Sequence, residues 1–330
     1  MLTLGERLSE LRAAPRFFTL VIPALCALYL LLCAGMRDLR SEHLILVSLV
    51  LGFSLCSDAS RRYARAVLPF LLYAGVYDSM RWYEDAIRSP IIHLREPYDF
   101  DLRFFGIQTA AGTLTPNEWW QLHTSKALDF ICGLSYTAPF FIGESILLSL
   151  FLVWSGQVKR AERFVWVFFV SNLIGFSFYY LYPAAPPWYV AAHGFVADLS
   201  VHASPGGAIR FDQLVGLPIM ANFYGKSADV FGAIPSLHVV YPFLSLVYGI
   251  RLRRFRWAFA VYFAIVCFSA VYLNHHYLLD VFIGLSLAGA TALGFRFVLG
   301  PLEAPEARRQ LQGDLVPRLQ RGDPAPQSRY

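Results

Sequence analysis

The chain has 330 residues, of which 56% are hydrophobic and 16% aromatic, and its formal net charge is +5. This composition excludes a pair of water-soluble domains and is typical of a polytopic membrane protein built from apolar helices. The basic residues lie in short loops and tails rather than in a stripe with interleaved aromatic residues, so the sequence does not predict nucleic-acid binding.

Apolar runs follow one another along the chain and predict an all-α helical membrane bundle with about eight transmembrane helices. Residues 1–16 place leucines on one face and predict a short interfacial helix. The runs lie at about 17–35, 43–58, 66–83, 129–154, 163–182, 233–250, 256–273 and 277–299. Their lengths suit a hydrocarbon core roughly 30 Å thick, although the second run is somewhat short. We therefore expect residues 17–300 to form one catalytic membrane domain and residues 301–330, rich in Pro, Arg and Gln, to be a disordered cytosolic tail.

Basic residues predict the orientation of these runs. If eight spans alternate, four basic clusters fall on one side together with the tail: residues 7–16, 61–65, 159–163 and 251–256. Among the short loops, only Arg37 and Arg40 fall on the other side, so both termini are predicted to be cytosolic. The long connections 84–128 and 183–232 then lie on the non-cytosolic side. Their aromatic and acidic residues suit short helices in the membrane interface.

One short polar stretch stands where the sixth apolar run begins. It reads Phe231-Gly-Ala-Ile-Pro-Ser-Leu-His238. This entry would bring backbone amides around Gly232 and Ala233, and the hydroxyl of Ser236, to a small anion at a helix N-terminus. His238 follows two residues after the hydroxyl. The stretch therefore predicts half of a phosphate site.

A second polar stretch, Tyr272-Leu-Asn-His-His-Tyr-Leu-Leu-Asp280, stands before the last run. His276 and Asp280 are four residues apart, so on a helix the carboxylate can accept the imidazole N–H, fix its tautomer and raise its basicity. That arrangement is typical of an activated nucleophile. The predicted orientation brings His238 and His276 to the same non-cytosolic surface. We expect His276, Asp280 and His238 to be the catalytic residues.

These two stretches resemble a known family. Pro235-Ser-Leu-His238 and the His276…Asp280 pair resemble the second and third signature motifs of the type 2 phosphatidic acid phosphatase superfamily. With Ala184-Ala-Pro-Pro-Trp-Tyr189, they resemble the aureobasidin-sensitive inositol phosphorylceramide synthase branch of that superfamily. The resemblance covers roughly residues 130–300. It implies a six-helix lipid-phosphatase-like core, a histidine nucleophile and no metal or other cofactor.

The chain departs from the superfamily pattern in its basic residues. The first motif, Lys-x6-Arg-Pro, is absent, and Ser269-Ala270 stands where the third motif has Ser-Arg. The resemblance implies that the narrower branch lacks these residues too. A phosphate then needs another cation, and Arg81 near the outer end of the third run is the first substitute. A structural ion pair of Arg81 with Asp78 or Glu84 is the equal alternative.

Other candidates have plainer alternatives. Lys226 and Arg210 are weaker phosphate-binding candidates, because solvated loop charge is the simpler interpretation of both. Trp188 lies in a rigid Pro-rich turn and is either a substrate contact or an interfacial anchor.

The remaining histidines and all the cysteines are interpreted as surface, structural or packing residues. His43, His93, His123, His193 and His202 are expected to be ordinary polar surface, and His275 is expected to be structural. A zinc site would need further ligands that the outer face does not clearly supply. The five cysteines have neither paired nor metal-ligand spacing and are interpreted as packing residues.

The resemblance implies headgroup transfer by double displacement. His276 would attack phosphatidylinositol, His238 would protonate the departing diacylglycerol, and a ceramide-like alcohol would accept the headgroup. The alternatives are a lipid phosphatase or diphosphatase that uses water, and a non-enzymatic lipid-binding bundle. The expected partners are membrane lipids, and the oligomeric state stays open. The absence of an Asn-x-Ser/Thr sequon favours a bacterial inner membrane over the Golgi.

Overall fold

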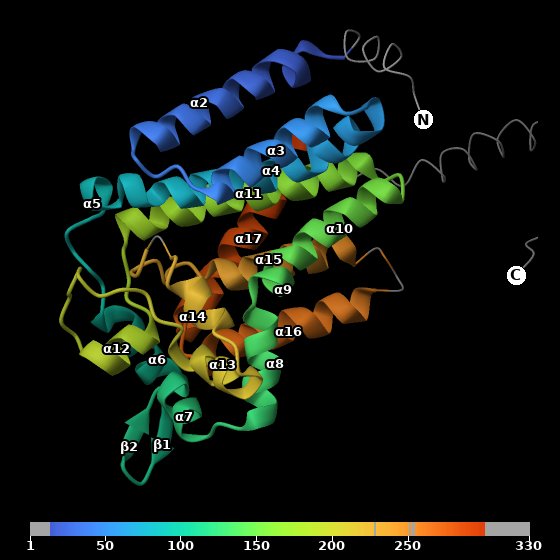
Figure 1. Cartoon of the computed structure of the whole chain (residues 1–330). Coiled ribbons are helices and arrows are strands. Elements are labelled where there is room, and N and C mark those ends of the chain that lie inside the picture. The colour runs from blue at the N-terminus through green and yellow to red at the C-terminus, as the bar shows by residue number, and fades with distance from the viewer. Residues whose placement is uncertain (1–13, 228, 251, 253–254, 301–330) are drawn as a thin grey trace, which may run out of the picture. The chain divides into compact units, whose positions relative to one another are not determined.

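The computed structural model describes residues 14–227, 229–250, 252 and 255–300 (Figure 1). Most of the predicted interfacial helix and the whole of the predicted tail 301–330 lie outside the described residues. The chain divides into two units, Met1–Ala292 and Leu293–Tyr330. The described part of the second unit, residues 293–300, contains the final turns of the last helix. All packing described below lies within the first unit.

Helices account for nearly all of the regular structure. The longer ones are α2 Ile22–Gly35, α3 Ser41–Leu55, α4 Asp58–Ser79, α6 Arg95–Phe105, α8 Lys126–Tyr136, α10 Gly143–Trp154, α11 Val158–Leu181, α15 Leu237–Gly249, α16 Arg256–Tyr272 and α17 Leu278–Leu299. The shorter ones are η1 Phe17–Val21, η2 Met80–Trp82, α5 Glu84–Ile87, α7 Pro116–Leu122, α9 Ala138–Phe141, α12 Pro187–His193, η3 Gly206–Ala208, α13 Ile209–Val215 and α14 Ile219–Tyr224. Strands β1 Ile107–Thr109 and β2 Gly112–Leu114 form an antiparallel hairpin with Ile107 opposite Leu114.

Each predicted apolar run is largely helical, but the runs differ in how well they suit a membrane. Among the described residues, three helices are long and apolar enough to cross a bilayer: Phe17–Gly35, Val158–Leu181 and Leu278–Leu299. A fourth candidate is the pair Lys126–Tyr136 and Pro139–Trp154, which is bent by 62°. The others are shorter apolar helices, except α4, which carries several charged residues in its first turns. The count of eight spans stays a prediction.

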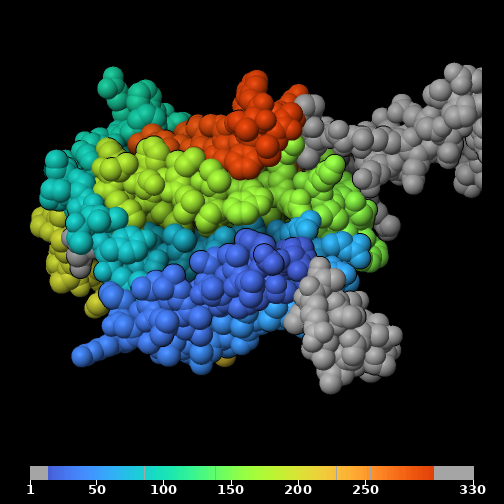
Figure 2. Space-filling model, turned by 90° about the horizontal axis from the view of Figure 1, so that it is seen from above, coloured from blue at the N-terminus to red at the C-terminus, as the bar shows by residue number. Residues whose placement is uncertain are grey.

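The N-terminal helices form a layer against α11. Helix α2 contacts α3, α3 contacts α4, and α4 contacts α11. Both views show α2 at the edge of this layer (Figures 1 and 2). Its surface exposes large leucines, with Leu28 52% and Leu31 70% exposed. Such a contiguous apolar face suits contact with lipid rather than with water.

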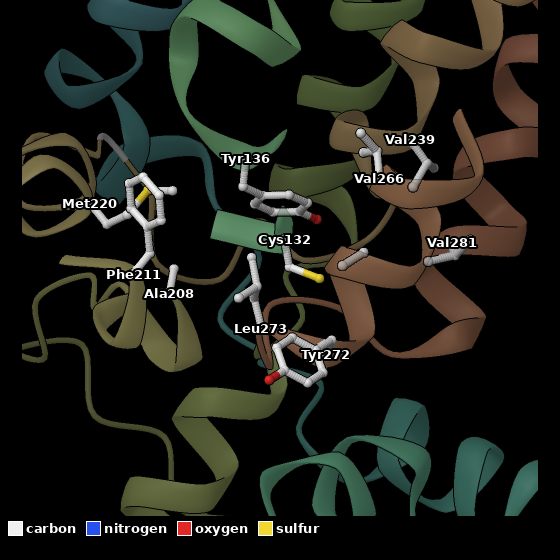
Figure 3. Packing of buried hydrophobic residues seen from close by; sticks show 11 residues of the cluster. Cys132, Tyr136, Ala208, Phe211, Met220, Val239, Val266, Tyr272, Leu273 and Val281 are labelled. Atoms are coloured by element: carbon white, nitrogen blue, oxygen red, sulfur yellow. The ribbon is translucent and has the colours of Figure 1, made fainter. Parts of the chain in front are cut away.

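A second layer surrounds a buried cluster that joins α8 to α16. Tyr136 and Cys132 of α8 lie in this cluster together with Val266 inside α16, Tyr272 at its end and Leu273 just beyond it (Figure 3). Residues from η3, α13, α14, α15 and α17 complete the cluster, which is closed to solvent. The cluster fixes α8 next to the turn that carries the histidine motif.

Two backbone features position that turn. Asn274 adopts a left-handed conformation with φ of 62°, which Asn tolerates better than most residues and which reverses the chain between α16 and α17. At Gly284 a side chain would collide with the carbonyl oxygen of Ser236, so only glycine lets α17 approach the start of α15 this closely. The two polar stretches therefore meet through the backbone.

Candidate active site

A cavity of about 460 Å³ lies where the polar stretches meet. We call one side of it the histidine wall, made by His238, His275, His276, Gly232 and Ala233. We call another side the charged wall, made by Arg40, Glu42, His43, Asp78, Arg81 and Lys226. Aromatic side chains, Tyr73, Tyr77, Tyr179 and Tyr241 among them, also line the cavity.

His276 is held with one ring nitrogen facing protein acceptors. Its Nδ1 lies 3.0 Å from the carbonyl oxygen of Ala233 and 3.4 Å from Oδ2 of Asp280. Because a carbonyl can only accept, Nδ1 carries the hydrogen and Nε2 keeps its lone pair. Asp280 is fully buried and its Oδ2 also accepts the backbone N–H of Tyr277 at 2.9 Å. The site therefore fixes the tautomer that a nucleophile requires.

The geometric reason for this pairing differs from the prediction. His276 lies in the turn before α17, which begins at Leu278, so the ring and the carboxylate are not neighbours on a helix face. The carboxylate of Asp280 turns back over the first turn of the helix to reach Tyr277 N–H and the ring. The four-residue spacing brings the two groups together through this helix start.

His238 completes the pair. Its Nδ1 lies 3.2 Å from Nε2 of His276, which places the two imidazoles in direct hydrogen-bond contact. The ring stacks on Tyr136 at 4.5 Å between centroids and also contacts Phe141. Nε2 of His238 makes no hydrogen bond to the described residues. This arrangement leaves one nitrogen of His238 available for proton transfer.

His275 supports the turn that carries His276. Its Nε2–H donates to the carbonyl oxygen of Pro205 at 2.9 Å, and its ring stacks on Tyr224 at 4.4 Å. Burial, and then the neighbouring His276, lowers the pKa of His275 to about 3, so it is neutral at physiological pH. The structural role expected for His275 agrees with these contacts.

Two residues that the sequence analysis did not assign to the site hold the histidine turn from outside. Asp101 on α6 is fully buried and accepts the N–H groups of Leu278 at 2.7 Å and Leu279 at 3.1 Å. Asn117 on α7 donates to the carbonyl oxygen of His276 at 3.0 Å. Burial raises the pKa of the Asp101 carboxyl to about 6. No local sequence pattern identifies Asp101 and Asn117, because their partners are main-chain groups more than 150 positions away.

The predicted anion-binding turn is partly engaged by the protein. The N–H of Ser236 donates to the carbonyl oxygen of Asp280 at 3.0 Å, and that of Ala233 donates to Ala184 at 3.3 Å. Parallel bridges join Ala184 to both His93 and Gly232, which ties the Pro-rich turn to the histidine wall. Ser236 Oγ is buried and makes no hydrogen bond to the described residues. Phosphate binding by Ser236, Gly232 and Ala233 stays a prediction.

The other predicted binding residues line the same cavity. Arg81 pairs with Asp78, with 2.9 Å between Nη2 and Oδ1, and thus makes one of the two ion pairs considered for it. Lys226 lies 3.4 Å from Glu42, and both side chains are exposed. Trp188 donates its backbone N–H to the carbonyl oxygen of Asn274 at 2.9 Å. A role in substrate binding for these three residues stays a prediction.

Arg210 serves the fold rather than the cavity. It pairs with Asp129, with 2.6 Å between Nε and Oδ1, and donates to Gln121 at 2.8 Å. It does not line the main cavity.

One histidine contradicts its expected surface role. His43 is only 2% exposed; its Nδ1 accepts the N–H of Arg40 at 3.2 Å and its Nε2 donates to Asp78 at 2.7 Å. The expectation of polar surface was wrong because the first turn of α3 folds this ring inward against α4. Asp38, His43 and Asp78 also place ligand atoms within 4.8 Å of one another, as a metal site would, but Arg40 already pairs with both carboxylates.

Comparisons with known proteins agree with the motifs. The sequence model of the PAP2 superfamily matches residues 110–294. Phosphoinositol dihydroceramide synthase of Bacteroides thetaiotaomicron is 36% identical over 285 residues, which cover 85% of this chain and 92% of that protein. Inositol phosphorylceramide synthase of Candida albicans is 32% identical over 50% of this chain and 35% of that protein.

A third relative extends the comparison, but no solved structure matches the chain. The inositol phosphorylceramide synthase catalytic subunit AUR1 of Saccharomyces cerevisiae is 27% identical over 73% of this chain and 58% of that protein. The family match, the relatives and the paired histidines agree with one another. The chain therefore belongs to the PAP2 superfamily, in its inositol phosphorylceramide synthase branch.

Proposed function

We propose that this integral membrane enzyme transfers phosphoinositol from phosphatidylinositol to a ceramide-like lipid alcohol through a phosphohistidine intermediate. The observation that carries the proposal is the tautomer of His276. Its Nδ1–H is held by Ala233 and Asp280, which leaves the Nε2 lone pair on the cavity side beside His238. The names of the relatives supply the substrate classes.

In the first step, Nε2 of His276 attacks phosphorus and the bond from phosphorus to the diacylglycerol oxygen breaks. His238 in its imidazolium form donates a proton to that departing oxygen. The headgroup phosphate is then bonded to His276, and Nδ1–H stays hydrogen-bonded to protein acceptors, which stabilise the positive charge on the ring. Asp280 supplies the carboxylate for this stabilisation.

In the second step, the hydroxyl of the acceptor lipid enters the place of diacylglycerol. His238 takes its proton, its oxygen attacks phosphorus, and the bond from nitrogen to phosphorus breaks. Proton transfer by a positioned histidine contributes typically about 10²–10⁴-fold to such a rate. We place this site on the non-cytosolic face because the basic loop clusters favour that orientation. We place it in a bacterial inner membrane because the chain has no Asn-x-Ser/Thr sequon.

The test is an assay of the purified full chain in detergent micelles that contain EDTA and phosphatidylinositol labelled in its headgroup. We expect the label to enter a new sphingolipid only when ceramide is added. Release of water-soluble inositol phosphate or phosphate irrespective of ceramide would replace this function with that of a phospholipase or phosphatase. A reaction that proceeds only when EDTA is left out would contradict the metal-independent histidine mechanism.

A further inference from the structure

The charged wall is built around one carboxylate. Asp78, at the end of α4, lies within 2.6 Å of Nη2 of Arg40 through both of its oxygens. The same carboxylate accepts from Nη2 of Arg81 at 2.9 Å and from Nε2 of His43 at 2.7 Å. Asp78 therefore holds two guanidinium groups and an imidazole in fixed positions against the cavity.

The two arginines are left with unused donors. Arg40 and Arg81 form their protein contacts through Nε and Nη2, and neither Nη1 group donates a hydrogen bond to the described residues. Both residues line the cavity. A guanidinium fixed in this way loses little conformational freedom when a ligand oxygen binds to it.

The charges on this wall nearly cancel. Arg40 pairs with Asp38 and Asp78, Arg81 shares Asp78, and Lys226 faces Glu42. A balanced wall of donors and acceptors suits a neutral group with several hydroxyls, because each hydroxyl can both accept and donate. A second phosphate or an ammonium group would instead favour a wall of one sign. The reacting phosphate belongs at the histidine wall, beside His276.

Most of the charged wall, all but Lys226, also lies outside the part of the chain that the family model matches. The family match covers residues 110–294, whereas residues 40–43 and 78–81 supply most of this wall. The chemical step and the choice of headgroup are thus assigned to different parts of the sequence.

We propose that the charged wall determines headgroup specificity by binding the hydroxyls of a polyol headgroup, with Arg40 and Arg81 as donors and Asp78 as the residue that positions them. The inference rests on the proposed function, since it concerns the donor of that reaction. It explains why Arg40, the exception to the pattern of basic loops, stands on the non-cytosolic side. In that position Arg40 can donate hydrogen bonds to the headgroup hydroxyls.

The first experiment compares phosphatidylinositol with phosphatidylglycerol as donor in the ceramide assay. Asp78→Asn keeps the side-chain shape but removes the charge that fixes both arginines. We expect KM for phosphatidylinositol to rise roughly tenfold, with a smaller effect on kcat, and the preference for phosphatidylinositol over phosphatidylglycerol to fall by a similar factor. Asp58→Asn, which removes an exposed arginine-paired carboxylate at the other end of α4, is the matched control. Unchanged donor preference in Asp78→Asn would overturn the proposal.

Two further measurements keep the test decisive. If Asp78→Asn does not fold, Arg81→Gln replaces it, because Arg81 is partly exposed and its loss leaves the contacts of Arg40 and His43 with Asp78 intact. The same loss of preference is expected, and unchanged preference again overturns the proposal. Separately, myo-inositol 1-phosphate should raise the Tm of the wild-type protein more than glycerol 3-phosphate does, and Arg81→Gln should abolish this difference. The Tm measurement does not require activity. If wild-type protein transfers no headgroup, only the proposed function is rejected. If both phosphates raise Tm equally, the charged-wall proposal is rejected.

Discussion

The two walls of the cavity are built in different ways. Apart from the pairing of His238 with His276, the histidine wall uses partners that are close in sequence or belong to the main chain, such as the contacts of His276 with Ala233 and of Asp280 with Tyr277. The charged wall uses side-chain pairs between the start of α3 and the end of α4, as in Arg40 with Asp78. Main-chain partners persist through most substitutions, whereas side-chain pairs can be exchanged singly. The first wall is suited to invariable chemistry and the second to adjustable selectivity.

The largest effect should follow from the nucleophile. In His276→Ala, headgroup transfer should fall by roughly 10⁴-fold or more, because no other described group offers a fixed lone pair at that position. The measurement is turnover with headgroup-labelled phosphatidylinositol, together with trapping of acid-labile label on the protein before ceramide is added. His123→Ala, a change at an exposed histidine outside the cavity, serves as control. Label trapped on the His276→Ala protein would contradict the assignment.

A smaller loss is expected at the second histidine. His238→Gln should lower transfer from phosphatidylinositol by roughly 10²–10⁴-fold, the range for a positioned acid and base. A donor with a p-nitrophenolate leaving group needs no proton on departure, so the first step should recover most of its rate with this donor. The release of p-nitrophenolate in a burst gives the measurement. Equal losses with both donors would show that His238 only supports the fold.

The next effect concerns the support of the histidine wall, and it depends on pH. The pKa of Asp101 is raised to about 6 from 3.8, so between these values the folded protein binds more protons than the unfolded one. Asp101 therefore makes stability fall as pH rises from about 4 to about 6, by up to about 3 kcal/mol.

Asp101→Asn should remove this part of the pH dependence. Tm in detergent measured between pH 4.5 and pH 7.5 gives the comparison, with Asp99→Asn, a neighbour on the same helix, as control. The difference in Tm between Asp101→Asn and wild type should shift in favour of the variant as pH rises from 4.5 to 7.5. The reason is that the amide has no charge to bury. Parallel curves for the two proteins would show that the carboxylate is not the titrating group.

The smallest effect should lie at the rim of the charged wall. Lys226 and Glu42 are 69% and 55% exposed, and such pairs contribute little because solvent screens them. Lys226→Gln should therefore change KM for phosphatidylinositol by about twofold or less. An increase in KM as large as that expected for Asp78→Asn would show that Lys226 is a principal contact of the headgroup.

The contrast between the walls also explains what could be predicted from the sequence. His238, His276 and Asp280 stand in short motifs whose spacing reflects local geometry, and the structure brings them together. The helical character of the apolar runs follows from composition and length. Even here one inference needed revision, because His276 precedes α17 and does not lie on it.

The remaining residues had no such signal. His43 looked like surface because its burial depends on Asp78, which lies 35 positions away. Asp101 and Asn117 act on main-chain groups of the histidine turn, a relation that no spacing encodes. Arg40 was noticeable in the sequence, because it is an exception to the distribution of basic residues among the loops. That distribution reports on membrane topology, however, and does not identify Asp78 as its partner. Long-range pairing of single side chains is the part of this site that a lone sequence does not specify.

The contact between the two imidazoles has one further consequence. Because Nδ1–H of His276 is directed to Ala233, the lone pair of His276 Nε2 accepts Nδ1–H of His238. In the proposed mechanism this hydrogen bond must break before Nε2 of His276 can attack phosphorus. Acylating reagents such as diethyl pyrocarbonate should therefore modify Nε2 of His276 slowly. In the proposed reaction, the entering donor lipid is what separates the two imidazole rings.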